Sequence, residues 1–184
     1  ASAKQSLMGK YGVSESTALL LFNGAFGYAP NREALEDLLF RINPILQTGK
    51  FDYLLLVCGI GIPVEFQEKT FPHARIIGFV DDLELYLKGC DAFLNPVIRG
   101  GGIKTKLVEA LGYNLNVIST ESGAAGVDPK LCNGKLRICK DHDWNAFAES
   151  VTQSARTGSD MPPAFYDQFY WGNIAEKAAG FIRS

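Results

Sequence analysis

Short apolar runs that alternate with helix-like segments constrain the fold more than any other feature of this sequence. The first two runs, residues 18–22 (ALLLF) and 53–58 (YLLLVC), are apolar throughout, as strands are when both faces of a sheet are covered. Between them, leucine and isoleucine recur at helical spacing up to residue 46. Strands that alternate with helices pair in parallel through right-handed crossovers. The sequence therefore predicts an α/β fold with a Rossmann-like parallel sheet and helices on both faces.

The same reasoning places the other elements. We expect further strands at residues 75–77, 90–94 and 116–119, an edge-like strand at 135–139, and helices over 64–69, 103–113 and 143–155. Helix caps are expected at Asn31, at Asp82 and at either Asp141 or Asp143, because these short polar side chains accept hydrogen bonds from first-turn amides. The 184 residues suit one domain, in which residues 1–16 lead in as a short helix or linker and residues 164–184 form C-terminal helices in two pieces.

Glycines follow nearly every predicted strand. Because parallel strands end at one edge of a sheet, we expect these glycines to converge there, where α/β proteins bind their ligands. The clustering favours a nucleotide cleft at that edge, formed by Gly24, Gly59, Gly61, Gly78, Gly100, Gly101, Gly102 and Gly123.

One stretch at this edge, residues 95–113 (NPVIRGGGIKTKLVEALGY), combines a glycine-rich turn with a helix start. Free amides and the helix dipole at such a turn favour a phosphate, and Arg99, Lys104 and Lys106 add three cations. The repeat of Ile103, Leu107 and Leu111 predicts the buried helix face. Glu109 can lean back toward the turn, where a carboxylate suits a ribose diol.

Composition excludes several classes of protein. The net charge of −2 provides no basic field for nucleic acid, and no apolar run is long enough to span a bilayer. Residues 1–10 do not read as a signal peptide. The four cysteines show no CxxC spacing, and neither of the two histidines lies near a cysteine pair. We therefore expect reduced thiols, no metal site and a cytoplasmic location.

Three stretches resemble the donor-binding half of GT-B glycosyltransferases of family 4. These are residues 22–35 (FNGAFGYAPNREAL), 78–97 (GFVDDLELYLKGCDAFLNPV) and 100–127 (GGGIKTKLVEALGYNLNVISTESGAAGV). The resemblance covers essentially the whole chain but only the second half of such an enzyme. It implies a protein that binds a nucleotide-diphospho-sugar and needs an N-terminal acceptor domain.

The resemblance also implies roles for individual residues. Many members carry an arginine and a lysine after the first glycine, whereas this chain has Ala25, Tyr28 and Asn31, so Lys104 and Lys106 are left to meet the diphosphate charge. The backbone at Val80 would face the nucleobase. The implied donor-binding set is Gly24, Gly59, Val80, Gly101, Gly102, Ile103, Lys104, Thr105, Lys106 and Glu109, with no metal ligand and no certain catalytic residue.

Alternatives remain open at several of these positions. Glu109 matches the second glutamate of the family's paired-glutamate motif, which binds the ribose hydroxyls; otherwise it is a solvated partner of Lys106. The first glutamate falls at Gly101 and is missing, which leaves the contact to the sugar hydroxyls unassigned. Arg99 either takes part or is an exposed loop residue. Residues 122–126 form a turn near the sugar or phosphates, or a tight crossover without ligand contact.

The implied activity is sugar transfer to a glycan or lipid-linked acceptor, as in polysaccharide biosynthesis, with retention of configuration and without a bound metal or other cofactor. The isolated chain is expected to bind nucleotide and to be inactive, and peripheral membrane association is possible only for the full-length enzyme. Two alternatives are a nucleotide-sugar epimerase of the same architecture and a non-catalytic nucleotide-binding or interaction module.

Overall fold

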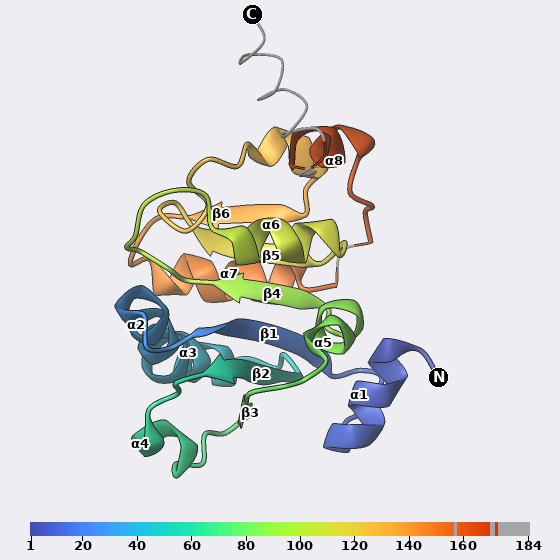
Figure 1. Cartoon of the computed structure of the whole chain (residues 1–184). Coiled ribbons are helices and arrows are strands. Elements are labelled where there is room, and N and C mark those ends of the chain that lie inside the picture. The colour runs from blue at the N-terminus through green and yellow to red at the C-terminus, as the bar shows by residue number, and fades with distance from the viewer. Residues whose placement is uncertain (157, 170–171, 173–184) are drawn as a thin grey trace, which may run out of the picture.

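A six-stranded, wholly parallel sheet forms the centre of the molecule (Figure 1). The computed structural model describes residues 1–156, 158–169 and 172. The strands run in the order β3-β2-β1-β4-β5-β6 and comprise β1 (Ala18–Ala25), β2 (Tyr53–Ile60), β3 (Ala74–Gly78), β4 (Ala92–Asn95), β5 (Asn116–Thr120) and β6 (Leu136–Cys139). The parallel sheet and the edge position of the sixth strand confirm the sequence-based prediction.

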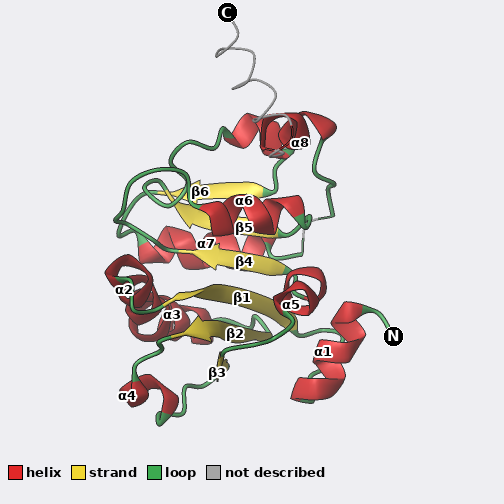
Figure 2. Cartoon of the chain, in the orientation of Figure 1, coloured by secondary structure: helices red, strands yellow, loops and turns green. Residues whose placement is uncertain are grey.

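Helices cover both faces of this sheet (Figure 2). One face carries α1 (Ala3–Tyr11), α5 (Leu83–Gly89) and α6 (Thr105–Gly112). The other face carries α2 (Ala29–Asp37), a π-helical turn (Leu38–Ile42), α3 (Asn43–Gln47) and α7 (Trp144–Ser154). Three short helices lie outside these layers: α4 (Val64–Gln67), a 3₁₀ turn (Pro129–Cys132) and α8 (Pro163–Phe169). The second predicted C-terminal helical piece lies outside the described residues.

The core fills both sides of the sheet with large apolar side chains. Leu19, Leu20, Leu21 and Phe22 of β1 are fully buried, as expected for a central strand covered on both faces. The predicted apolar face of the segment after β1 is buried along its whole length through Ala34, Leu35, Leu38, Leu39, Ile42 and Leu46. The π-helical turn lets this face continue from α2 into α3.

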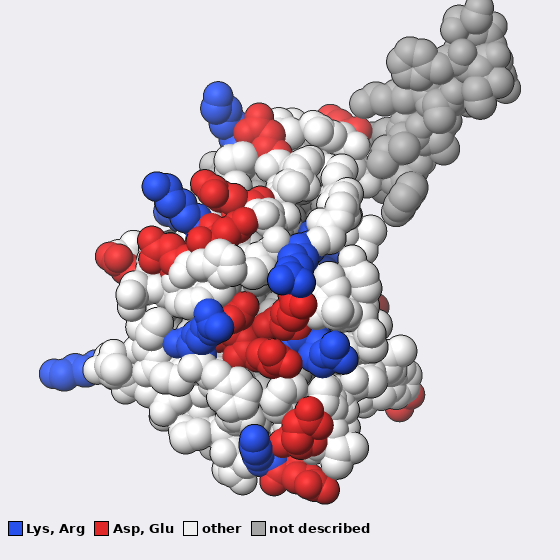
Figure 3. Space-filling view, turned by 90° about the vertical axis from the view of Figure 1, so that its left-hand side faces the viewer, with Lys and Arg blue, Asp and Glu red and all other residues white. Residues whose placement is uncertain are grey.

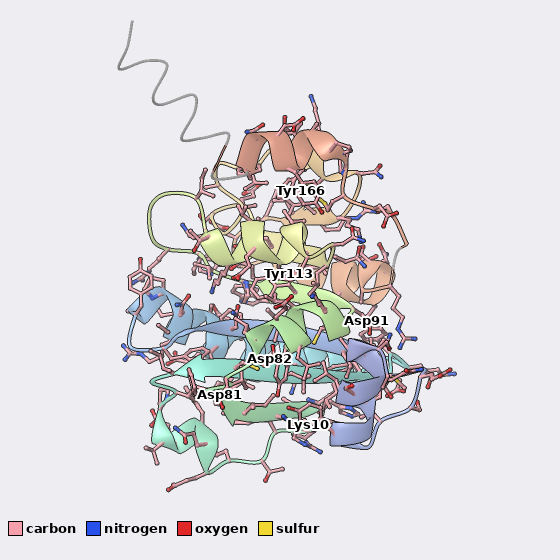
Figure 4. The ribbon with its side chains drawn as sticks, turned by 45° about the vertical axis from the view of Figure 1, so that its right-hand side comes forward. Lys10, Asp81, Asp82, Asp91, Tyr113 and Tyr166 are labelled. Carbon is pink, nitrogen blue, oxygen red and sulfur yellow. The ribbon has the colours of Figure 1, made fainter. Side chains whose placement is uncertain are left out.

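Helix α1 is fastened to the sheet through polar contacts. The Lys4 ammonium lies 2.5 Å from the Asp91 carboxylate, and Asp91 in turn accepts a hydrogen bond of 2.8 Å from the Leu19 amide of β1. Lys10 donates to the Tyr86 hydroxyl at 3.0 Å, and this hydroxyl lies 2.8 Å from that of Tyr11. Figure 4 shows Lys10 on α1 and Asp91 at the start of β4. These contacts lie at the start of the sheet, away from the carboxyl edge.

Two of the three predicted caps form and one does not. Asp82 accepts from the Leu85 amide at 3.0 Å, and Asp143 accepts from the Ala146 amide at 3.0 Å. Asp141 instead accepts hydrogen bonds from the amide and hydroxyl of Ser122. The prediction for Asn31 was wrong, because α2 already begins at Ala29 and no side chain caps its first turn.

The prediction for Ile103 was also wrong. Helix α6 begins at Thr105, so Ile103 precedes the helix and remains 49% exposed. Leu107 and Leu111 are fully buried, as predicted. The four-residue spacing therefore holds for Leu107 and Leu111 within the helix, whereas Ile103 lies two residues before the helix begins.

The backbones of β1 and β2 meet closely at two glycines. Gly24 pairs with Gly59 in the parallel register, and Gly59 has a φ of +143°. A Cβ atom at Gly59 would lie 1.9 Å from the Gly24 carbonyl oxygen. Only glycine therefore allows the two strands to end side by side.

We expect Gly59→Ala to lower the free energy of unfolding by about 2–4 kcal/mol, because a backbone oxygen cannot move aside as a flexible side chain can. Urea unfolding followed by circular dichroism measures the change. Gly9→Ala is the control: nothing lies within 4 Å of its added Cβ inside α1, so it should be neutral or stabilise by up to about 1 kcal/mol. Equal stabilities for the two variants would contradict this view of the strand ends.

Candidate functional site

A cavity of about 230 Å³ opens at the carboxyl ends of β1, β2 and β3. Three residues predicted from the sequence, Gly24, Gly59 and Val80, line it together. The remaining lining residues are Asn23, Ala25, Cys58, Ile60, Phe79 and Leu83. The cavity thus lies at the edge of the sheet where α/β proteins bind their ligands.

The cavity walls are mostly apolar and include two side chains that are open to solvent. Phe79 is 68% exposed and Ile60 is 57% exposed. Asn23 also lines the cavity, and its buried Oδ1 accepts no hydrogen bond from any described residue. An apolar slot with an exposed aromatic side chain and a buried amide suits a flat heterocycle with a hydrogen-bond donor.

The glycine-rich turn between β4 and α6 presents free backbone amides. None of the amides from residues 100 to 106 donates a hydrogen bond to a described residue. Gly100 and Gly102 have φ values of +90° and +71°, which other residues rarely adopt, and Gly101 is exposed. Unbonded amides at the start of an eight-residue helix provide partial positive charge for an anion.

Lys104 lies within this turn rather than reaching away from it. Its Nζ donates to the carbonyl oxygens of Gly100 at 2.6 Å, Gly102 at 3.0 Å and Gly101 at 3.4 Å. The carbonyls are therefore drawn toward the ammonium. Lys104 adds its positive charge to the turn and stabilises the turn's shape at the same time.

Lys106 connects the glycine turn with the end of β1. Its Nζ donates to Asn31 Oδ1 at 2.7 Å, lies 3.5 Å from the Asn23 carbonyl oxygen, and lies 4.5 Å from the centre of the Phe22 ring. Burial, with a smaller contribution from Lys104, lowers the pKa of Lys106 from 10.5 to about 7. This ammonium has only neutral partners, so an arriving anion would stabilise its charged form.

The position of Lys106 also marks the topological switch point of the sheet. Strands β1 and β4 are neighbours, and the helices that follow them, α2 and α6, cover opposite faces. The bond from Lys106 on α6 to Asn31 on α2 therefore crosses the crevice between the two halves of the fold. Ligands of open α/β sheets bind in this crevice.

Glu109 and Thr105 are exposed on α6, and Glu109 lies one turn beyond Lys106 on the same flank of the helix. Lys106 donates to Asn31, and no ion pair with Glu109 forms. The alternative interpretation of Glu109 as a partner of Lys106 is therefore wrong.

Arg99 pairs with Glu33 of α2 at 3.2 Å, which spans the same crevice. Figure 3 looks onto the carboxyl edge of the sheet and shows acidic and basic side chains intermixed there. Anion binding at this edge therefore depends on local groups rather than on a uniform basic field.

Hydrogen bonds to neighbouring segments hold the small-residue turn after β5 in place. Thr120 donates to the Val97 carbonyl at 2.6 Å and accepts from the Gly123 amide at 3.1 Å, while Asn95 donates to the Gly123 carbonyl at 3.0 Å. A Cβ at Gly126 would lie 2.6 Å from Ile103. The turn thus supports the glycine-rich loop from behind, as a tight crossover would.

Sequence reasoning missed three features of the site. Asn31 was interpreted as a helix cap, whereas it binds Lys106 and also donates to the Ala25 carbonyl at 3.0 Å. Asn23 was assigned no ligand contact, and Phe79 was placed in the nucleobase segment without a role for its ring, yet both line the cavity. The sequence held one signal for this role: the loop after β1 lacks charged residues, so Asn31 stands where a cation was expected.

The chain belongs to the family described as "Glycosyl transferases group 1", whose sequence pattern matches residues 17–156. The search of curated proteins found no match. The family membership and the fold agree with one half of a GT-B glycosyltransferase.

Solved structures of low sequence identity share this fold. WaaG, a glycosyltransferase involved in lipopolysaccharide biosynthesis, superposes with a TM-score of 0.69 at 19% identity over 98% of this chain and 50% of WaaG. TarM gives 0.70 at 14% identity over 92% of this chain and 36% of TarM. HepE of Anabaena, in a complex with UDP-glucose, gives 0.65 at 15% identity over 98% of this chain and 52% of HepE. The chain thus spans about half the length of WaaG and HepE.

Three further observations concern the described residues only. They contain no group of three or more His, Cys, Asp or Glu side chains placed to hold a metal ion. None of the helices among them combines the length and apolarity needed to cross a bilayer. All four cysteines are free thiols, as expected, and burial raises the pKa of Cys58.

Lys106→Met tests the cost of burying this charge. Between pH 7 and 10.5 the unfolded chain holds the lysine proton and the folded chain does not, so the wild-type protein gains stability as pH rises. We expect the Met variant to be more stable than wild type by about 1–3 kcal/mol at pH 6, and this advantage to shrink toward pH 10.

Urea unfolding at pH 6, 8 and 9.5 measures the difference. Lys130→Met, at an exposed position on the 3₁₀ turn, is the matched control and should show no such trend. A stability difference for Lys106→Met that does not vary with pH would contradict a buried, partly neutral lysine.

Proposed function

We propose that this chain is the donor-binding part of a glycosyltransferase that transfers a sugar from a nucleotide-diphospho-sugar to a glycan or lipid-linked acceptor. The observation that carries the proposal is the meeting of an apolar cavity, free turn amides and the Lys106 ammonium at one edge of the sheet. The solved structures of HepE in complex with UDP, with UDP and glucose, and with UDP-glucose support a nucleotide sugar as the ligand class.

In this proposal the nucleobase enters the cavity at the ends of β1, β2 and β3. The exposed Phe79 ring offers a stacking surface, and the buried Asn23 amide offers a hydrogen-bond acceptor. The ribose then extends toward α6, where the exposed Glu109 carboxylate accepts hydrogen bonds from the two hydroxyls.

The diphosphate lies over the glycine turn at the start of α6. Free amides of residues 101–106 and the Lys106 ammonium meet its charge, with Lys104 adding positive potential from within the turn. As the bond between the sugar and the diphosphate breaks, negative charge grows on the leaving phosphate oxygen, and these groups stabilise it. The charge is met by protein groups, so we propose transfer without a bound metal, and by family likeness with retention of configuration.

The acceptor and the remaining catalytic groups would be supplied by an N-terminal domain that packs against the carboxyl edge of this one. Such an enzyme would work in the cytoplasm, with at most peripheral contact to a membrane. The chain alone would bind the nucleotide and transfer nothing.

Calorimetric titration of the chain with UDP, GDP and ADP tests the proposal. We expect one of these to bind, with an affinity unchanged by EDTA. Glu109→Ala should weaken binding about tenfold to a hundredfold, because a hydrogen bond to a charged group contributes about 1.5–3 kcal/mol.

Glu15→Ala is the matched control, since Glu15 is exposed just before β1 at the opposite edge of the sheet. Binding that is lost equally in both variants, or no binding of any nucleotide, would refute the proposal. The second outcome would favour an interaction module.

A further inference from the structure

Asn31 makes contacts that a helix cap or a surface residue would not make. Its side-chain Nδ2 donates to the Ala25 carbonyl at 3.0 Å, and its Oδ1 accepts from Lys106 Nζ at 2.7 Å. A Cβ at Gly24 would lie 3.0 Å from this Nδ2. The amide group is therefore held between the loop after β1 and the Lys106 ammonium, directly beside the cavity.

Lys106 depends on this amide because its other partners are weak. The Asn23 carbonyl lies at 3.5 Å and the Phe22 ring centre at 4.5 Å, so Asn31 accepts its one short hydrogen bond. An ammonium has three donors. At least one is therefore available to a ligand while Asn31 holds the side chain in place.

Charged groups around Lys106 do not neutralise it. Lys104, at the start of α6, is like-charged and contributes to its low pKa. On α2, Glu33 is paired with Arg99. On α6 itself, Glu109 forms no ion pair with Lys106. An uncompensated ammonium held by neutral acceptors is a site prepared for an anion.

We propose that Asn31 is a positioning residue, which holds the Lys106 side-chain nitrogen at the crevice between α2 and α6 so that a nucleoside diphosphate meets an already placed amino group with no anionic partner. This inference rests on the function proposed above. A neutral amide fulfils the role because it accepts a hydrogen bond without cancelling the charge. An aspartate of the same shape would form an ion pair and compete with the phosphate.

The proposal predicts that nucleotide binding is coupled to the uptake of a proton by Lys106. Burial and the nearby Lys104 lower the pKa of Lys106 to about 7, so at pH 8 the side chain is mostly neutral. A bound diphosphate favours the charged form and raises this pKa. Binding at pH 8 is therefore accompanied by the uptake of about one proton, and affinity falls by up to about tenfold per pH unit above 7.

The experiment titrates the full chain with UDP, or with GDP or ADP if one of these binds better, at pH 7.5, 8 and 9. Calorimetry in two buffers of different ionisation enthalpy counts the protons taken up. We expect wild type to take up about one proton at pH 8, as worked out above. Asn31→Asp should bind the nucleotide at least about tenfold more weakly and take up almost none, because its carboxylate keeps Lys106 protonated beforehand.

Asn145→Asp is the control, because it makes the same change of charge at an exposed position on α7. It should match wild type in affinity and in proton uptake. Thermal unfolding verifies that each variant is folded, and the NMR titration of the Lys106 side chain in wild type, without ligand, reports its pKa independently of any variant.

The outcomes separate the two proposals. If wild type binds a nucleotide but Asn31→Asp shows the same affinity and proton uptake, the role of Asn31 is refuted and the donor-binding function stands. Nucleotide binding by wild type without proton uptake at pH 8 would also refute the role of Asn31. If wild type binds no nucleotide at all, the donor-binding function fails, and the role of Asn31 fails with it.

Discussion

The hydrogen bond from Lys106 to Asn31 joins two parts of the molecule that follow different strands. Lys106 belongs to α6, which follows β4, and Asn31 belongs to α2, which follows β1. These strands are neighbours at the centre of the sheet, and their helices lie on opposite faces. The bond brings the first turn of α6 next to the loop after β1, where Gly24 and Ala25 line the cavity.

The loop after β1 brings no positive charge to this edge of the sheet. Ala25, Tyr28 and Asn31 occupy that loop, and none of them is charged. The positive charge instead comes from α6 and reaches back across the crevice through the long lysine side chain. Burial makes the charged form of Lys106 costly, and an arriving anion would stabilise that form.

The sequence predicted the fold well because the signals for it are local. Apolar runs such as residues 53–58 define central strands, and Asp82 and Asp143 cap helices through contacts three residues away. The convergence of Gly24 and Gly59 on one cavity followed from the parallel order of the strands, whereas Val80 was placed there by the family resemblance. These features need no knowledge of which distant side chains meet.

The missed features all depend on contacts between distant segments. Asn31 has the residue type of a helix cap but lies in the first turn of α2, and only the packing of α6 against the crevice reveals its bond to Lys106, 75 positions away. Ile103 fits the helical spacing of Leu107 and Leu111, but the preceding glycines delay the helix start until Thr105. Lys104 turns back onto its own loop, which depends on the conformation of Gly100 and Gly102.

Amide chemical shifts of the isotope-labelled chain, followed by NMR during a UDP titration, examine the joined edge directly. If the turn amides and the cavity bind one nucleotide together, the largest shifts will fall on residues 101–106 and on Gly24, Gly59 and Val80, and the two groups will saturate at the same UDP concentration. Shifts confined to other surfaces, or turn amides that stay unmoved while the cavity saturates, would show that the two features do not form one site.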